Sequence, residues 1–246
     1  MLELDRLRYH PLEKLNVPRP VHRIDYIRSR CKGLRVLDLG AYDETEVAKP
    51  QHRSWRWLHA EIAAVATEVL GVDASPKLRA SGGIKTRAGT RIVYGAVEDL
   101  APLLREFRPD VVVAGELIEH TAYTLGWLSA LGNARPGIRI LATTPNATSL
   151  INIALAFLKR ENNHPDHLQI YSFKTLATLS RQLRMTDVSI RPYFYHSQLF
   201  QGRVPKSLAP AVAAVDVLML RPVQFLFPLT GFGLIWEGVI PGAGRS

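Results

Sequence analysis

The stretch Leu34-Arg-Val-Leu-Asp-Leu-Gly40 decides the fold of this chain. Its apolar run has the length of a buried β-strand. The glycine that ends the run lets the backbone turn tightly into a following helix and approach a ligand closely. Similar runs follow, separated by segments with helical spacing, at residues 68–73, 91–94, 110–114 and 138–142. This alternation predicts parallel strands joined by crossover helices on both faces of the sheet.

We therefore expect an α/β, Rossmann-like fold with a seven-stranded, mostly parallel sheet. Residues 1–33 are expected to form an N-terminal helical cap, residues 34–194 the core, and residues 195–246 a C-terminal extension. The extension is expected to hold a helical, apolar insertion before a last strand near residues 232–239. The remaining helices are expected at 57–67, 100–107, 121–134 and 172–183, and a further strand at 187–193.

The amino-acid composition limits the classes of protein to which this chain can belong. The 246 residues are 47% hydrophobic and 22% charged, which is typical of a folded globular chain. The single cysteine, Cys31, excludes an internal disulfide and a four-cysteine zinc site. Residues 1–15 lack the apolar core of a signal peptide, so we expect a cytoplasmic protein. The apolar segment 223–236 is too short to span a bilayer, so no transmembrane segment is expected.

The net charge of +9 permits an anionic partner such as nucleic acid, a phosphorylated sugar or an acidic membrane surface. The basic residues are scattered and form no block of five, and a binding stripe needs clustering. Nucleic acid is therefore not the favoured partner. Residues 223–229 are candidates for a substrate lid, a homodimer face or a peripheral membrane contact.

Polar residues follow three successive strands. Gly40 and Tyr42 follow the first strand, Asp73 ends the second, and Glu98 and Asp99 follow the third. A carboxylate at such a strand end accepts hydrogen bonds from a ribose diol, as in nucleotide-binding α/β folds. Ligands in these folds bind at the carboxyl ends of the strands, so we expect a nucleoside-containing cofactor at this edge.

With these residues, the chain resembles the class I S-adenosylmethionine (SAM)-dependent methyltransferases over about residues 34–190. The resemblance implies that Asp38 and Gly40 lie near the methionine part of SAM, that Asp73 holds the ribose, and that Glu98 or Asp99 lies beside the adenine. The usual Gly-x-Gly-x-Gly turn is replaced here by Gly40-Ala-Tyr-Asp-Glu44. The connection over residues 45–58 is also longer than usual, and we expect Tyr42 to cover part of the cofactor.

A second group of residues indicates a metal site. Glu116-Leu-Ile-Glu-His120 directly follows the fourth strand, and Asn162-Asn-His-Pro-Asp-His167 follows the fifth. Both segments are expected at the same edge of the sheet, where their side chains can converge. Carboxylate oxygens with an imidazole nitrogen suit Mg²⁺ or Mn²⁺. The alternative is an acidic turn at a helix N-terminus with an exposed histidine.

The Glu-x-x-Glu-His element is similar to that of two metal-dependent O-methyltransferase families. One methylates the 2′-hydroxyl at small-RNA 3′ ends, and the other methylates catechols in ubiquinone biosynthesis. The resemblance to the RNA family implies the ligands Glu116, Glu119, His120 and His167. The His-Pro-Asp-His loop and the segment Tyr171-Ser-Phe-Lys-Thr-Leu176 also resemble bacterial methyltransferases of glycan and natural-product pathways, whose acceptors are sugar hydroxyls.

The expected function is SAM-dependent O-methylation, with Mg²⁺ or Mn²⁺, of a vicinal-diol hydroxyl on a sugar or saccharide-bearing metabolite. A divalent cation lowers the pKa of a coordinated hydroxyl, and His120, His164 or His167 accepts the proton. The alternative acceptors are an RNA 3′ end and a catechol or quinone precursor. A non-catalytic cofactor-binding subunit is the alternative from another class. Residues 193–196 are candidates for a sugar pocket.

Overall fold

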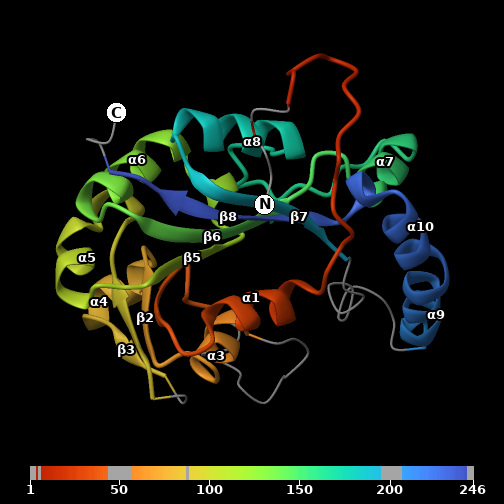
Figure 1. Ribbon diagram of the computed structural model, residues 1–246. Helices are drawn as coiled ribbons and strands as arrows, with labels where there is room; N and C mark the ends of the chain where they lie inside the picture. Colours follow the sequence, from red (N-terminus) through yellow and green to blue (C-terminus); the bar gives the residue numbers. More distant parts are fainter. Residues whose placement is uncertain (1–3, 5–6, 44–56, 87–88, 195–206, 243–246) are drawn as a thin grey trace.

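The computed structural model describes residue 4 and residues 7–43, 57–86, 89–194 and 207–242. These residues form an eight-stranded sheet with the order β3-β4-β2-β1-β5-β6-β8-β7 and helices on both faces (Figure 1). The strands are β1 (Arg35–Leu39), β2 (Glu68–Asp73), β3 (Ile84–Lys85), β4 (Arg91–Tyr94), β5 (Val111–Gly115), β6 (Ile138–Pro145), β7 (Thr186–Tyr193) and β8 (Gly233–Ile240). The α-helices are α1 (Arg23–Cys31), α3 (Leu58–Ala63), α4 (Pro76–Ser81), α5 (Ala101–Phe107), α6 (Thr124–Ala134), α7 (Leu150–Phe157), α8 (Phe173–Gln182), α9 (Ala209–Val215) and α10 (Arg221–Leu226).

The α/β class expected from the sequence is confirmed, with one difference in the strand count. Strands β4, β2, β1, β5 and β6 pair in parallel, and β8 runs antiparallel between β6 and β7. The additional strand, β3, pairs antiparallel with the edge strand β4 over two residues. The expected count of seven is therefore wrong. A two-residue pairing is too short to produce the hydrophobic pattern from which a strand is predicted.

Two predicted helices are shorter in the structure. Helix α3 ends at Ala63, because the chain turns there to begin β2. Helix α6 begins at Thr124, because Ile118–His120 form a separate 3₁₀ turn, η3. The hydroxyls of Thr121 and Thr124 both donate to the carbonyl of Ile118, which closes this turn before α6 starts.

The central strands are buried on both faces. In β5, Val112 and Ala114 pack in a core with residues of α5, α6 and α8, whereas Val111 and Val113 pack with residues of α1 and α3. All four side chains are fully buried. Burial on both faces explains why this strand is a continuous apolar run in the sequence, with no alternation of polar residues.

A buried carboxylate fixes α1 against the sheet. Glu237 of β8 is 3% exposed. Its Oε1 accepts hydrogen bonds from Tyr26 Oη at 2.6 Å and Arg30 Nη2 at 2.5 Å, and its Oε2 accepts one from Arg30 Nε at 2.8 Å. The hydrogen bond to Glu237 raises the pKa of the Arg30 guanidinium. This contact holds the N-terminal helix at the sheet, beside the carboxyl end of β5.

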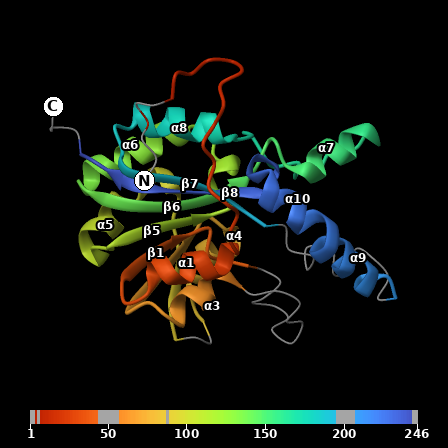
Figure 2. The same ribbon diagram turned by 45° about the vertical axis from the view of Figure 1, so that its right-hand side comes forward.

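The segment between β7 and β8 contains α9, a π-helix η5 (Asp216–Leu220), α10 and a 3₁₀ turn η6 (Pro228–Thr230). With α7, it projects from the body of the molecule (Figure 2). Among the described residues, no helix has the length and apolar character needed to cross a membrane.

The Glu237 contact predicts an asymmetric response to removal of two glutamates. Glu237→Ala removes a carboxylate that is 3% exposed and that accepts three hydrogen bonds from Tyr26 and Arg30, and we expect the free energy of unfolding to fall by about 2 to 3 kcal/mol. The matched control is Glu68→Ala, because Glu68 pairs with Arg35 at the surface, where both side chains are more than a third exposed. That change is expected to cost less than about 1 kcal/mol. Urea unfolding measures the free energy of unfolding of both variants. Equal losses in the two variants would contradict a stabilising role of Glu237 beyond that of a surface ion pair.

Candidate active site

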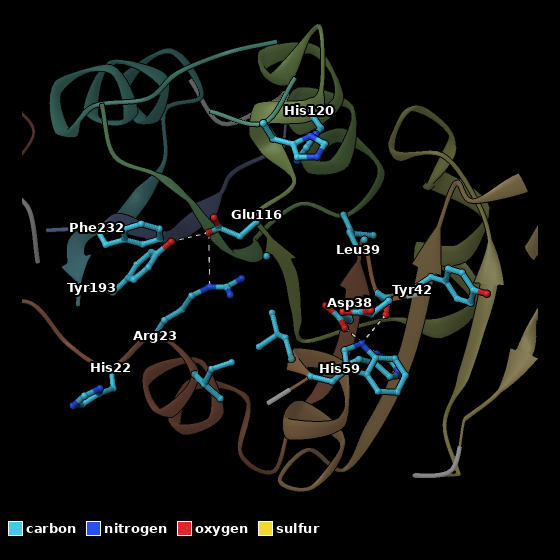
Figure 3. A pocket seen from close by; sticks show the side chains of 18 of the residues that line it. His22, Arg23, Asp38, Leu39, Tyr42, His59, Glu116, His120, Tyr193 and Phe232 are labelled. Carbon is cyan, nitrogen blue, oxygen red and sulfur yellow. Dashed lines mark hydrogen bonds and ion pairs between the residues drawn. The ribbon is translucent and has the colours of Figure 1, made fainter. Parts of the chain in front are cut away.

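A cleft of about 1090 Å³ opens at the carboxyl ends of β1 and β5. Its walls come from α1, the turn after β1, the segment after β5, the loop near residue 165 and the end of β7 (Figure 3). This is the edge at which α/β sheets of this kind bind ligands. The cleft therefore joins the two groups of residues that the sequence singled out.

The turn after β1 contains Gly40 but lacks the two later glycines of the usual Gly-x-Gly-x-Gly turn. Gly40 has φ +71°, a left-handed conformation that other residues rarely adopt. The backbone N–H of Tyr42 donates to Asp73 Oδ2 at 3.1 Å, and Trp57 Nε1 donates to the carbonyl of Ala41 at 3.1 Å. Hydrogen bonds to Asp73 and from Trp57 thus hold the backbone of this turn in place although it has only one glycine.

Asp38 makes a buried contact that sequence reasoning missed. His59 Nδ1 lies 2.8 Å from Asp38 Oδ2, and His59 Nε2 lies 2.8 Å from the hydroxyl of Thr90. Asp38 and His59 are 2% and 1% exposed. The sequence places His59 in a connection where aromatic residues usually serve packing, so nothing in its spacing indicates this hydrogen bond. The contact fixes the floor of the cleft, which both side chains line.

The predicted cofactor-binding residues divide into two groups. Asp38, Gly40 and Tyr42 line the cleft. Asp73 ends β2, where its second oxygen accepts from the N–H of Ser75 at 2.8 Å. Glu98 and Asp99 are exposed on the 3₁₀ turn η2 (Val97–Asp99) and are not among the cleft-lining residues described. Their assignment to the adenine stays a prediction, and most of the long connection after Tyr42 lies outside the described residues.

The second group of residues brings together a set of metal-binding atoms. One ligand atom each of Glu119, His120 and His167 lie within 4.8 Å of one another. The backbone N–H groups of Leu168 and Gln169 donate to the carbonyl of Glu119 at 2.8 and 3.1 Å, which brings the His167 loop onto η3. The tertiary structure thus places residues 48 positions apart in one cluster.

The carboxylate of Glu119 is buried and makes no hydrogen bond of standard geometry among the described residues. The residue is 1% exposed, and the nearby Thr144 hydroxyl and Arg23 stabilise its charged form only in part. Burial, with the nearby charge of Glu116, raises the pKa of Glu119 from 4.5 to about 8. Burial also lowers the pKa of His167, helped by the neighbouring His120 and His164. His167 is therefore neutral at physiological pH, which is the form that coordinates metals.

Glu116 lies in the same cleft but outside this cluster. Its carboxylate Oε1 accepts a hydrogen bond from Tyr193 Oη at 3.0 Å and lies 3.8 Å from Arg23 Nε (Figure 3). Its backbone has φ +53°, in the left-handed region that costs energy for a residue with a side chain. Hydrogen bonds from its N–H to the carbonyl and hydroxyl of Thr143 hold this conformation. The role of Glu116 as a metal ligand stays a prediction.

Arg23 and Tyr193 complete this side of the cleft. Arg23 Nε donates to the hydroxyl of Thr143 at 3.0 Å, so the side chain reaches from α1 over the end of β6. Burial raises the pKa of the Tyr193 hydroxyl well above 10, with a contribution from the charge of Glu116. That hydroxyl therefore remains a donor. Phe194 also lines the cleft, and the other two residues proposed for a sugar pocket, Tyr195 and His196, lie outside the described residues.

His164 is the third histidine at this end of the cleft. Its ring centroid lies 5.9 Å from that of His167 and 6.2 Å from that of His120. The side chain is 60% exposed, and its Nδ1 lies 3.6 Å from the carboxylate of Asp166. His164 is thus close to the cluster, and it lies outside the three residues whose ligand atoms converge.

No family model matches the chain, and no curated protein matches its sequence. Solved structures match over most of its length. A SAM-dependent methyltransferase from Archaeoglobus fulgidus has 15% identity and a TM-score of 0.50, covering 88% of this chain and 94% of that one. A SAM-dependent methyltransferase from Thermotoga maritima has 10% identity and a TM-score of 0.53, covering 88% and 87%. The small RNA methyltransferase HEN1 has 14% identity and a TM-score of 0.52, covering 95% of this chain and 27% of that one. The chain therefore has the fold of the SAM-dependent methyltransferases.

The pKa of Glu119 predicts how stability depends on pH without metal. A carboxyl with a higher pKa in the folded state binds more protons when folded, so the free energy of unfolding falls as pH rises from about 4.5 to about 8. In Glu119→Gln this fall should be smaller by about 2 kcal/mol or more. Urea unfolding at pH 5 and pH 8 in EDTA compares the two proteins. Identical pH dependence would show that Glu119 is ionised normally.

Proposed function

We propose that this protein is a SAM-dependent O-methyltransferase that uses Mg²⁺ or Mn²⁺ and methylates a vicinal-diol hydroxyl of a sugar or saccharide-bearing metabolite. The observation that carries the proposal is the cleft, which is lined at one end by the Gly40 turn and at the other by His120 and His167. In this fold the turn after the first strand is where a nucleoside-containing cofactor binds. Asp38, Gly40 and Tyr42, which line this end of the cleft, would hold SAM there, and SAM would supply the methyl group.

The residues present fit a divalent cation. A buried carboxylate such as that of Glu119, which makes no hydrogen bond of standard geometry among the described residues, is costly to ionise unless a positive charge compensates it. His120 and His167 supply nitrogen atoms within 4.8 Å of that carboxylate. A donor set of oxygen and imidazole nitrogen is compatible with Mg²⁺ or Mn²⁺. The elevated pKa of Glu119 in the metal-free protein is consistent with a site that lacks its compensating charge.

An alcohol is a poor nucleophile at neutral pH, and a divalent cation supplies the acidity by lowering the pKa of the hydroxyl that it coordinates. His164 is our candidate base. Its Nδ1 accepts a hydrogen bond from the Asp166 N–H at 3.3 Å. Its ring would therefore have to turn a proton-bearing Nδ1 toward the Asp166 carboxylate, 3.6 Å away, before Nε2 could accept the released proton. Arg23 and the Glu116–Tyr193 pair line the same cleft, where the guanidinium and the carboxylate would orient an acceptor rich in hydroxyl groups. Correct positioning of the two reactants then accounts for most of the remaining rate.

A second acceptor class shares this chemistry. The terminal ribose of an RNA 3′ end also carries a vicinal diol, and the fold likeness to HEN1 and the net charge of +9 favour it as the second candidate. Phosphate contacts make RNA binding fall steeply as salt is raised, whereas a neutral saccharide is insensitive to salt. Activity on each acceptor at 50 and 200 mM salt would distinguish the two.

Calorimetric titration with S-adenosylhomocysteine tests the cofactor end. We expect the wild-type protein and Glu119→Ala to bind it with dissociation constants within about threefold, because Glu119 is not among the residues that line the cofactor end. Absence of binding to the wild type would favour the non-catalytic alternative. Absence of any heat would contradict the proposed cofactor.

Titration with Mn²⁺ tests the metal end separately. Glu119→Gln should weaken Mn²⁺ binding at least about tenfold, because it removes the only carboxylate of the three-residue cluster. Glu106→Gln, an exposed residue of α5, is the matched control and should bind Mn²⁺ like the wild type. Glu116→Gln separates two roles: lost Mn²⁺ binding makes Glu116 a ligand, and lost turnover with retained Mn²⁺ binding makes it an acceptor contact. Unchanged Mn²⁺ binding in Glu119→Gln would refute the metal site.

A further inference from the structure

Large apolar side chains are exposed on two neighbouring helical segments. We call the following residues, each between 62% and 85% exposed, the apolar surface: Phe157, Leu158, Leu218, Met219, Leu226 and Phe227. They lie at the end of α7 and along η5 and α10. A monomeric soluble protein rarely exposes such a cluster unless the cluster binds a partner.

The helix that carries most of this surface has its polar side inward. Over residues 214–227 the two buried residues are polar, Asp216 at 1% exposure and Gln224 at 0%. Asp216 pairs with Arg221 Nη2 at 3.2 Å. The apolar residues of the same stretch point outward instead. Helix α7 is similar, because it has no buried residue despite the sequence LINIALAF. A surface helix whose outer side contacts only water has its apolar side buried and its polar side exposed.

The two segments belong to one end of the molecule. Figures 1 and 2 both show α7 and the α9–α10 segment projecting on the same side. The start of α7 is tied to the end of the other segment, because Asn146 Nδ2 and the Thr148 hydroxyl both donate to the carbonyl of Leu229, at 2.8 and 2.7 Å. Strand β6 ends and β8 begins at this edge. The apolar surface therefore lies at the same edge of the sheet as the cleft.

The charges beside the apolar surface are mainly positive. Lys159 and Arg160 follow the end of α7 and are exposed, and the exposed Arg19 lies 4.2 Å over the ring of Phe225. Residues 147–160 contain no acid, the exposed Glu161 comes next, and the only acid of residues 207–230 is the buried Asp216. A second copy of the chain would bring like charges together around this surface. A partner with anionic groups around an apolar interior matches both features.

We propose that the apolar surface docks the protein on an anionic lipid bilayer, with its side chains in the acyl boundary and Lys159 and Arg160 at the lipid headgroups. Projecting helices with apolar outer residues and flanking basic residues bind bilayers in this interfacial manner. Anionic headgroups attract basic residues close to the membrane surface. The inference does not depend on the proposed methyl transfer, because bilayer binding is measured without a reaction.

The test is co-sedimentation of the full chain with vesicles. We expect binding to vesicles of phosphatidylcholine with 30% phosphatidylglycerol to be at least about tenfold tighter than to phosphatidylcholine alone. The double substitution Leu218→Ser with Phe227→Ser should weaken binding to the anionic vesicles at least about tenfold. The pair Lys159→Glu with Arg160→Glu should abolish the preference for anionic lipid.

Leu12→Ser is the matched control, because Leu12 is 97% exposed and lies outside the apolar surface. It should bind vesicles like the wild type, and circular dichroism melting curves should show that all variants are folded. Vesicle binding that is absent in the wild type, or unchanged in the double variant, overturns the proposal. Sedimentation velocity tests the other occupant. If the wild type does not bind vesicles but forms a concentration-dependent dimer, and if Leu218→Ser with Phe227→Ser dissociates that dimer, the apolar surface binds a second copy of the chain instead.

Discussion

The parallel pairing of β1 with β5 is the interaction on which the rest of this structure depends. Val36–Leu39 pair in register with Val111–Ala114, so both strands end at the same edge of the sheet. The turn that begins at Gly40 and the segment that begins at Glu116 consequently face one cleft. Because both strands are buried on both faces, a shift of one residue would move every side chain of the shifted strand to the opposite face, and both layers of helices would have to repack. The cleft is thus a consequence of how the core packs.

Elements that are distant in the sequence from β1 and β5 form the remaining walls of the cleft. Helix α1 is fixed by the contacts of Tyr26 and Arg30 with the buried Glu237, and this placement brings Arg23 over the end of β6 and close to Glu116. The same edge receives the His167 loop through backbone hydrogen bonds to Glu119. The Glu237 contacts of α1 and the backbone hydrogen bonds of the His167 loop therefore form two sides of the cleft. Arg23 of α1 and Tyr193 of β7 lie on one side, and the histidines of η3 and of the loop near residue 165 lie on the other. If the proposed function holds, an acceptor would enter between these two sides, with Arg23 on one and the Glu119, His120 and His167 cluster near the other.

The outward apolar residues of α7 and α10 give this edge a further property. A surface made of Phe157, Leu218 and Phe227 beside the cleft would hold the enzyme where an amphiphilic acceptor is concentrated. Asp216 and Gln224 are buried on the opposite side of the same helical stretch, so its polar side packs against the protein and its exposed side is apolar. Catalytic edge and membrane-facing edge would then coincide, and a saccharide headgroup on a lipid would satisfy both.

The sequence by itself determined the central strands β1, β2, β4, β5 and β6 and most of the helices between them, because buried runs such as residues 110–114 and the amphipathic segments carry their own periodicity. It did not indicate β3, α4 or α7, which are short or exposed. It also indicated Gly40 at a sharp turn and Glu119, His120 and His167 at one edge, since residues after parallel strands must meet there. Only the tertiary structure decided that Asp38 is bonded to His59, that Glu116 is held by Tyr193 and Arg23, and that the polar side of α10 faces inward. Those contacts join residues 21 to 93 positions apart through side-chain rotamers and a left-handed backbone at Glu116. Hydrophobic periodicity encodes which face of an element is buried, and it carries no information on which distant side chain will meet a given carboxylate.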